Sequence, residues 1–234
     1  MENQKIDLLS LYESELEEFI ISIGEPKYRA GQMFPQLHKG LSPEEMTNIG
    51  KKTREKLSEV AEYHLPQVRR KLVSALDGTV KYLFELRDGH CVESVVMRYN
   101  HGNTICISSQ VGCRMGCKFC ASTIGGRVRD LTPGEPLGQV IAAQKDLGER
   151  ISNIVMMGIG EPLDNYDNVI STVSDQLVSL RRDVVTSENS NYFIAQNISQ
   201  IPCFTQKLKS IFANYITLAI CQHIKGYFAQ PRVR

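Results

Sequence analysis

The sequence predicts an α/β protein in which a partial βα barrel follows a helical module and a β-hairpin extension. Three observations support this fold class. Apolar residues recur at helical spacing in the first part of the chain, β-rich runs with Asp-Gly turns follow, and a strand, loop, helix and buried strand come next. We therefore expect four regions, at residues 1–68, 69–103, 104–170 and 171–234.

The first region is predicted to be a small helical accessory domain. Ser10 with Glu13, and Ser42 with Glu45, have the Ser-x-x-Glu spacing of a capping box, which marks the start of a helix. The apolar residues after the first box recur at helical spacing, so this helix should bury one face. They are Leu16, Phe19, Ile20 and Ile23.

The second region has the pattern of a β-hairpin extension. Its β-rich runs lie at 69–75, 80–86 and 91–98, and the dipeptides Asp77-Gly78 and Asp88-Gly89 separate them. Asp-Gly between alternating apolar runs is a strong signal for a tight hairpin turn. We expect successive antiparallel strands here.

The third region is typical of a βαβ unit. A β-rich run at 104–109 leads into a cysteine-rich loop, and Thr132 with Glu135 forms a third capping box, from which a helix should continue to Gly148. An apolar run at 153–160 then predicts a buried strand. Ligands of such units collect at the carboxyl ends of the strands, where both the cysteine loop and the end of this run should lie.

The last region differs in composition from the rest of the chain. Residues 171–234 contain one of the 17 glycines and three of the 26 acidic residues, and no further βα unit is legible. A segment at 204–220 has helical amphipathic spacing. We expect a divergent tail that is either disordered or frame-disrupted.

Composition predicts a soluble cytoplasmic protein, because no apolar run reaches the roughly 18 residues of a membrane span and the amino terminus lacks the order of a signal peptide. The formal net charge is +1, which neither requires nor excludes a nucleic-acid partner. Seven cysteines, an odd number with one tight cluster, favour metal or redox chemistry over a disulfide framework.

The cluster is Cys113, Cys117 and Cys120, within the run GCRMGCKFCAS. Three thiolates at this C-x3-C-x2-C spacing can bind three corners of a cubic iron-sulfur cluster and leave one iron open to another ligand. Zinc is the alternative metal, but it prefers four ligands and no second Cys or His pair is present. Three unrelated buried thiols are the remaining alternative, which the interleaved glycines disfavour.

The runs ISSQVGCRMGCKFCAST and IVMMGIGEPLDNYDNV resemble the radical S-adenosylmethionine RNA methyltransferases that methylate adenine, the RlmN/Cfr family. The resemblance covers about residues 5–170. It implies a radical-SAM barrel, a 4Fe-4S cluster and S-adenosyl-L-methionine as cofactors. It also implies methylation of carbon 2 of an adenosine in 23S rRNA and in some tRNAs beside the anticodon, with an electron donor such as flavodoxin. We expect a monomer without a membrane partner.

By this resemblance, Cys113, Cys117 and Cys120 are the cluster ligands, and Gly160 and Glu161 bind the cofactor through its ammonium group.

Two further residues have implied catalytic roles. Glu93 matches a glutamate that accepts a proton, and Cys106 matches a thiol that resolves a covalent protein-RNA intermediate by a transient disulfide. Their positions alone would predict a solvent-facing strand glutamate and a buried strand cysteine.

The family mechanism also requires a methyl-carrying cysteine late in the chain. Only Cys203 and Cys221 follow the cluster, and the residues around them do not resemble that site. At roughly 30 residues per βα unit, the residues after Cys120 are too few for a six-unit barrel. We therefore expect a truncated barrel and an inactive copy; the alternative is a non-catalytic RNA- or Fe-S-binding fragment.

Overall fold

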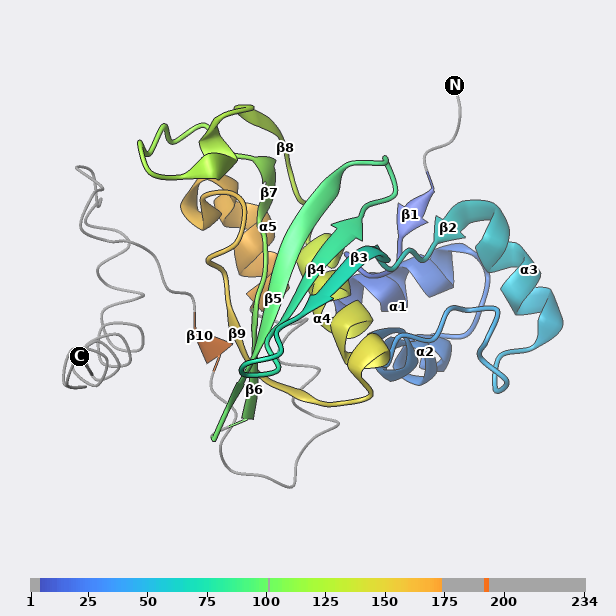
Figure 1. The fold of residues 1–234 in the computed structure, drawn as a ribbon. Helices are drawn as coiled ribbons and strands as arrows, with labels where there is room; N and C mark the ends of the chain where they lie inside the picture. Colours follow the sequence, from blue (N-terminus) through green and yellow to red (C-terminus); the bar gives the residue numbers. More distant parts are fainter. Residues whose placement is uncertain (1–4, 101, 174–191, 194–234) are drawn as a thin grey trace.

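The computed structural model describes residues 5–100, 102–173 and 192–193. Its centre is a six-stranded mixed sheet with the strand order β10-β9-β6-β5-β4-β3. Helix α4 lies against the sheet, and helices α1 to α3 lie together at one side of the molecule (Figure 1). The protein is therefore a mixed α/β fold, as the sequence predicted.

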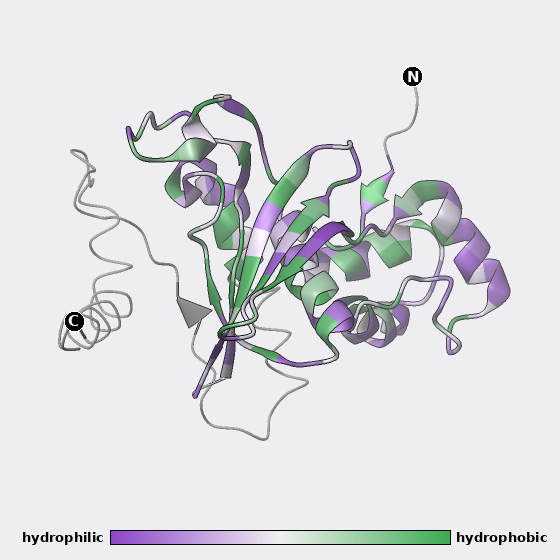
Figure 2. Cartoon of the chain, in the orientation of Figure 1, coloured by the Kyte–Doolittle hydropathy of each residue, from purple (hydrophilic) through white to green (hydrophobic). Residues whose placement is uncertain are grey.

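The helical module contains α1 (Glu13–Ser22), α2 (Tyr28–His38) and α3 (Lys51–Val60). Strands β1 (Ile6–Asp7) and β2 (Ala61–Glu62) pair in parallel and close the module. Its core is apolar, whereas α3 is mostly hydrophilic (Figure 2). The fully buried residues include Leu16, Ile20, Met33, Leu37 and Leu57.

Two of the predicted capping boxes differ from the structure. Helix α1 begins after Tyr12, whose amide donates to the Glu15 carboxylate at 2.9 Å, so the prediction of a box between Ser10 and Glu13 was wrong. The Ser42 amide does donate to the Glu45 carboxylate at 2.7 Å, but the chain there forms turns and the next helix starts at Lys51. One local hydrogen bond does not offset the cost of nucleating a helix.

The central sheet begins with an antiparallel meander. Its strands are β3 (Gln67–Val73), β4 (Val80–Glu85), β5 (Cys91–Tyr99) and β6 (Gly102–Cys106). The first three strands match the predicted runs. The hairpin extension is thus continuous with the strand that leads to the cysteines.

The other half of the sheet is parallel. Strand β9 (Ile151–Val155) pairs with β6, and β10 (Tyr192–Phe193) pairs with β9. Strands β6 and β9 end three and five residues earlier than the predicted runs, at Cys106 and Val155. The residues beyond these ends bond to one another in an irregular arrangement and build the candidate site.

A small separate hairpin carries the cysteines. It consists of β7 (Gln110–Gly112) and β8 (Arg127–Asp130), with the short helix η1 (Ala121–Thr123) in the connecting loop. Figure 1 shows this hairpin beyond the carboxyl end of the sheet. The sequence predicted only a loop here, because three- and four-residue strands give little periodic signal.

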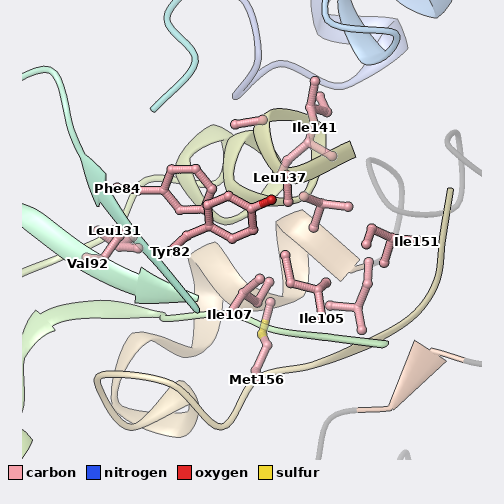
Figure 3. Close-up of a cluster of buried hydrophobic side chains, with 14 of the residues drawn as sticks. Tyr82, Phe84, Val92, Ile105, Ile107, Leu131, Leu137, Ile141, Ile151 and Met156 are labelled. Carbon is pink, nitrogen blue, oxygen red and sulfur yellow. The ribbon is translucent and has the colours of Figure 1, made fainter. Parts of the chain in front are cut away.

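Helix α4 (Gly134–Leu147) covers one face of the sheet. Tyr82, Phe84 and Ile105 from the strands point toward Leu137 and Ile141 of the helix (Figure 3). The rings of Tyr82 and Phe84 stack with centroids 5.1 Å apart. Because strand side chains alternate between faces, the intervening residues of β4 and β5 point away from α4.

The helical module is held tightly against α4. A side chain at Gly134 would place its Cβ 2.7–2.9 Å from atoms of Asp7 and Leu9, and one at Gly138 would lie 2.7 Å from the Pro66 ring. The Gly134 amide also donates to the Ser10 hydroxyl at 3.0 Å. Ser10 therefore caps α4 from the other module instead of starting α1.

Two further elements complete the described chain: η2 (Pro162–Asn165) and α5 (Tyr166–Ser171). Among the helices described, none has the length and apolarity that crossing a membrane requires. The predicted segment at 204–220 lies outside the described residues.

Candidate functional site

The three clustered cysteines lie on the loop of the β7–β8 hairpin. The Cys113 amide donates to the Gly126 carbonyl at 3.0 Å and closes the neck of this loop. Gly112 has a φ of +73°, and a Cβ there would lie 2.0 Å from the Gly126 carbonyl oxygen. The Cys120 amide donates to the Cys117 carbonyl at 3.0 Å, so the loop folds back on itself between the last two cysteines.

The three thiols share one electrostatic environment. Cys113 is buried, while Cys117 and Cys120 are half-buried. Burial raises the pKa of the Cys113 thiol; the Met115 amide opposes the shift, and the neighbouring Cys120, Cys117 and Glu161 raise the pKa further. A bound cation would compensate for three thiolates held this close together.

Three thiols on one short loop are the donor set of this site. Their number matches a cubic iron-sulfur cluster with one open iron, whereas a tetrahedral zinc ion prefers four protein ligands. Within the described ranges, no group of three or more His, Cys, Asp or Glu residues is arranged to hold a single metal ion.

The residues after β9 dock directly on the residues before the cysteine loop. The amides of Ser109 and Gln110 donate to the Ile159 carbonyl at 2.9 and 3.2 Å, and the Gly158 amide donates to the Ile107 carbonyl at 3.0 Å. This contact joins two segments about 50 residues apart in the sequence.

Gly160 allows this close approach. Its φ is +106°, a conformation that L side chains rarely adopt, and a Cβ there would lie 2.6 Å from the Gln110 Cβ. The Ser109 hydroxyl would lie 2.8 Å from the same Cβ; this buried hydroxyl has no hydrogen-bond partner in the described structure.

Glu161 follows at the start of η2. Burial raises the pKa of its carboxyl group, the Leu163 amide opposes this shift and the Asp164 carboxylate adds to it. The Leu163 amide donates to the Glu161 carboxylate at 3.2 Å. A cationic ligand group would favour the ionised form of this carboxylate.

The structure adds a polar network that the sequence analysis missed. The buried Gln110 side chain donates to Asp130 at 2.7 Å and to Asp164 at 3.1 Å, and it accepts from the Glu161 amide at 2.9 Å. Arg114, inside the cysteine loop, makes a two-pronged ion pair with Asp164, with its Nε 2.9 Å from Oδ2. The polar run SSQ directly after an apolar strand was the one available sequence signal for this network.

A second set of buried polar residues fixes the same strand ends. Gln139 on α4 accepts from the Ser108 amide at 2.9 Å and donates to the Ser108 carbonyl at 3.1 Å. The Ser108 hydroxyl donates to the Glu93 carbonyl at 2.7 Å and accepts from the Ile159 amide at 2.9 Å. Asn165 donates to the carbonyls of Ser109 and Leu131, both at 2.9 Å.

Glu93 and Cys106 lie on the sheet face opposite α4. Cys106 is paired with Val95 across β5 and β6, and Glu93 is two residues from Val95, so both side chains point to the same face. Diagonal neighbours of this kind have Cα atoms roughly 7–8 Å apart. Glu93 forms an ion pair with Lys81 at 2.8 Å. Burial raises the pKa of the Cys106 thiol, and the Met157 amide opposes that shift.

The structure thus brings the predicted residues into two neighbouring groups. The cysteine loop, Gly160 and Glu161 meet beyond the ends of β6 and β9, and Glu93 and Cys106 lie on the neighbouring sheet face, opposite α4. The late cysteines Cys203 and Cys221 lie outside the described residues.

The fold resembles a solved structure. It superposes on the crystal structure of a radical SAM methyltransferase from Sphaerobacter thermophilus with a TM-score of 0.67 and 38% sequence identity, over 72% of this chain and 51% of that one. The described part therefore shares its fold with part of a radical SAM methyltransferase.

Sequence comparisons show which proteins the chain is similar to. Residues 6–63 match the family model of the ribosomal RNA large subunit methyltransferase N-terminal domain. The curated relatives that the chain matches are proteins named RlmN. The chain is 46% identical over 222 residues to a probable dual-specificity RNA methyltransferase RlmN from Lachnospira eligens, and 55% identical over 167 residues to one from Alkaliphilus metalliredigens.

The chain matches only part of these relatives. The first alignment covers 93% of this chain and 61% of the relative, and the second covers 71% of this chain and 47% of the relative. The chain therefore spans about half to three-fifths of their length. An alignment of 93% of the chain also continues past residue 170, where the resemblance noted from motifs ends.

Proposed function

We propose that this chain is an RlmN-type radical SAM protein that binds a 4Fe-4S cluster and S-adenosyl-L-methionine and is directed at carbon 2 of adenine in 23S rRNA and some tRNAs. The observation that carries the proposal is the docking of residues 158–161 onto residues 107–110, directly ahead of the three-cysteine loop. The half-buried Glu161 carboxylate lies close enough to the Cys113 thiol to raise its pKa, which supports a site for a cluster and an ammonium-bearing cofactor.

Each residue has a role in this proposal. Cys113, Cys117 and Cys120 hold three irons of the cluster. The Glu161 carboxylate accepts hydrogen bonds from the ammonium group of the cofactor, and Gly160 lets this segment lie close to the loop. When bound, the cluster and the cofactor supply one-electron chemistry that generates a radical. Glu93 accepts a proton from the adenine ring. The Cys106 thiol would attack the sulfur of a second cysteine that is covalently linked to the RNA, so that the bond from this sulfur to the RNA breaks, the methylated product leaves and a disulfide forms.

The sheet face opposite α4 supports this division of roles. The half-buried side chains of Glu93 and Cys106 point to the same side, where a flipped-out base would reach both, and Glu93 forms an ion pair with Lys81. We propose that this sheet is the first part of a radical-SAM barrel and that the remaining units would enclose the face. An electron donor such as flavodoxin would reduce the cluster, in a cytoplasmic, monomeric protein.

Cluster binding is tested by anaerobic reconstitution with iron and sulfide. The chain should bind about four irons and four sulfides, with a brown absorption spectrum and an EPR signal after reduction that changes when S-adenosyl-L-methionine is added. Cys117→Ser should lose the cluster. Cys91→Ser is the matched control, because Cys91 is an exposed cysteine on β5 away from the loop. A colourless protein with bound zinc would refute the proposal.

A second function is favoured by the cysteines late in the sequence. The residues around Cys203 and Cys221 do not resemble the methyl-carrying site that the family mechanism requires. We therefore propose, as the second candidate, a protein that binds the cluster and RNA without completing methyl transfer. Incubation with a 23S rRNA fragment, both cofactor and reductant should give binding without turnover, and methylated adenine in the product would contradict this.

A further inference from the structure

Gln110 occupies a position that joins every segment of the proposed site. It is fully buried, and it lies three residues before Cys113 at the start of β7. A glutamine side chain offers two N–H donors and one carbonyl acceptor with two lone pairs. Both donors and the acceptor are used here, by Asp130, Asp164 and the Glu161 amide.

Each of these partners belongs to a different part of the site. Asp130 pairs with Gln110 across the β7–β8 hairpin and so fixes the base of the cysteine loop. Asp164 belongs to η2 and binds Arg114 within the loop itself. The Glu161 amide belongs to the cofactor-binding segment. One side chain therefore sets the relative position of the hairpin, the loop and Glu161.

Apolar packing does not hold the cysteine loop. Its large apolar side chains are exposed, by 48% for Met115, 76% for Phe119 and 86% for Ile124. Without a buried apolar anchor, the position of the loop relative to Glu161 depends on the hydrogen bonds at its neck and on the links through Gln110 and Arg114.

We propose that Gln110, with the Arg114–Asp164 ion pair, is a positioning residue that preorganises the cysteine loop for its cluster. This inference rests on the proposed function, because it assigns these residues a role toward that same cluster. Mutating a residue that orients a metal ligand without touching the metal commonly lowers the affinity for the metal about 10–100-fold. The loop residues themselves stay unchanged when Gln110 is replaced.

The test compares the rate at which a chelator removes iron from the reconstituted protein. Gln110→Glu keeps an acceptor for the Glu161 amide but replaces both donors with a carboxylate facing Asp130 and Asp164. It should release iron about 10–100-fold faster than the wild type. Gln144→Glu is the matched control, because Gln144 on α4 accepts from the Ile151 amide at 2.9 Å at the far end of β9.

A second variant separates positioning from folding. Arg114→Met removes the link between loop and η2 at a side chain that is 60% exposed, so the apoprotein should lose no more than about 1 kcal/mol of stability. Its iron release should nevertheless accelerate, whereas Arg70→Met, at an exposed arginine on β3, should not affect it. If Gln110→Glu fails to fold, Arg114→Met decides the question alone.

The outcomes separate this inference from the proposed function. A wild-type protein that takes up no cluster would overturn both. A wild-type protein with a stable cluster, and variants that release iron at the rate of their controls, would overturn only the role of Gln110 and Arg114. Faster release, with at most a small loss of stability in the Arg114→Met apoprotein, is the result we expect.

Discussion

Replacing Gly160 with alanine tests whether the segment after β9 is packed as tightly on residues 107–110 as the structure indicates. The new Cβ would lie 2.6 Å from the Gln110 Cβ and 2.8 Å from the Gln110 amide nitrogen, and the backbone would have to keep a φ of +106°. This conformation costs a non-glycine residue about 1–3 kcal/mol. Overpacking adds a cost of about 1–3 kcal/mol.

We expect Gly160→Ala to lower the free energy of unfolding by about 3 kcal/mol, which corresponds to a fall of roughly 6–12 °C in the unfolding temperature for a domain of this size. Urea unfolding of the apoprotein, followed by circular dichroism, measures the loss. The expected loss of stability is large because the backbone strain and the overpacking act at one position. Neither Ser109 nor Gln110 can move away without breaking its hydrogen bond to the Ile159 carbonyl.

Three other glycines separate the two contributions. Gly158 has no positive φ, but a Cβ would lie 2.7 Å from the Ile107 carbonyl oxygen, so its alanine variant measures overpacking alone. Gly126 has a φ of +68° with open space, so Gly126→Ala should cost about 1 kcal/mol. Gly125 has neither constraint, and its variant should stay within about 0.5 kcal/mol of the wild type. A loss at Gly160 no greater than that at Gly126 would refute the tight docking.

Two further predictions concern the packing and the charges around this site. Ser10→Ala removes the hydroxyl that accepts from the Gly134 amide, and it should lower the free energy of unfolding in urea by about 1 kcal/mol. Ser58→Ala is the control at an exposed serine and should cost less. Equal losses in the two variants would show that Ser10 does not cap α4. The side-chain bond from Arg114 lowers the pKa of Asp164 below the usual value of an aspartate. The unfolded state therefore binds more protons between the folded and unfolded pKa values, and stability should fall as the pH drops through that window. Asp164→Asn should remove this part of the acid sensitivity in unfolding curves measured below pH 5, and an unchanged pH dependence would contradict the assignment.

The sequence by itself determined the elements whose signals are local. Alternation and Asp-Gly turns predicted β3 to β5 to within a few residues, and the third capping box predicted α4, whose Thr132 amide does donate to the Glu135 carboxylate at 2.9 Å. The proposal that the three cysteines bind a cluster likewise came from the sequence alone, because their spacing on one short loop is a local pattern. Local patterns suffice where the interacting residues are neighbours in the chain.

Only the tertiary structure decided how the site is held together. The partners of Gln110 are 20 and 54 residues away along the chain, and Ser10 caps a helix 124 residues away. The periodicity of the sequence does not indicate contacts between residues so far apart in the chain. The sequence therefore placed Ser10 at the wrong helix and predicted no role for Gln110. Buried polar side chains take whichever partners the packed fold brings within reach, and unpaired ones are costly, so their roles emerge only when the segments are packed together.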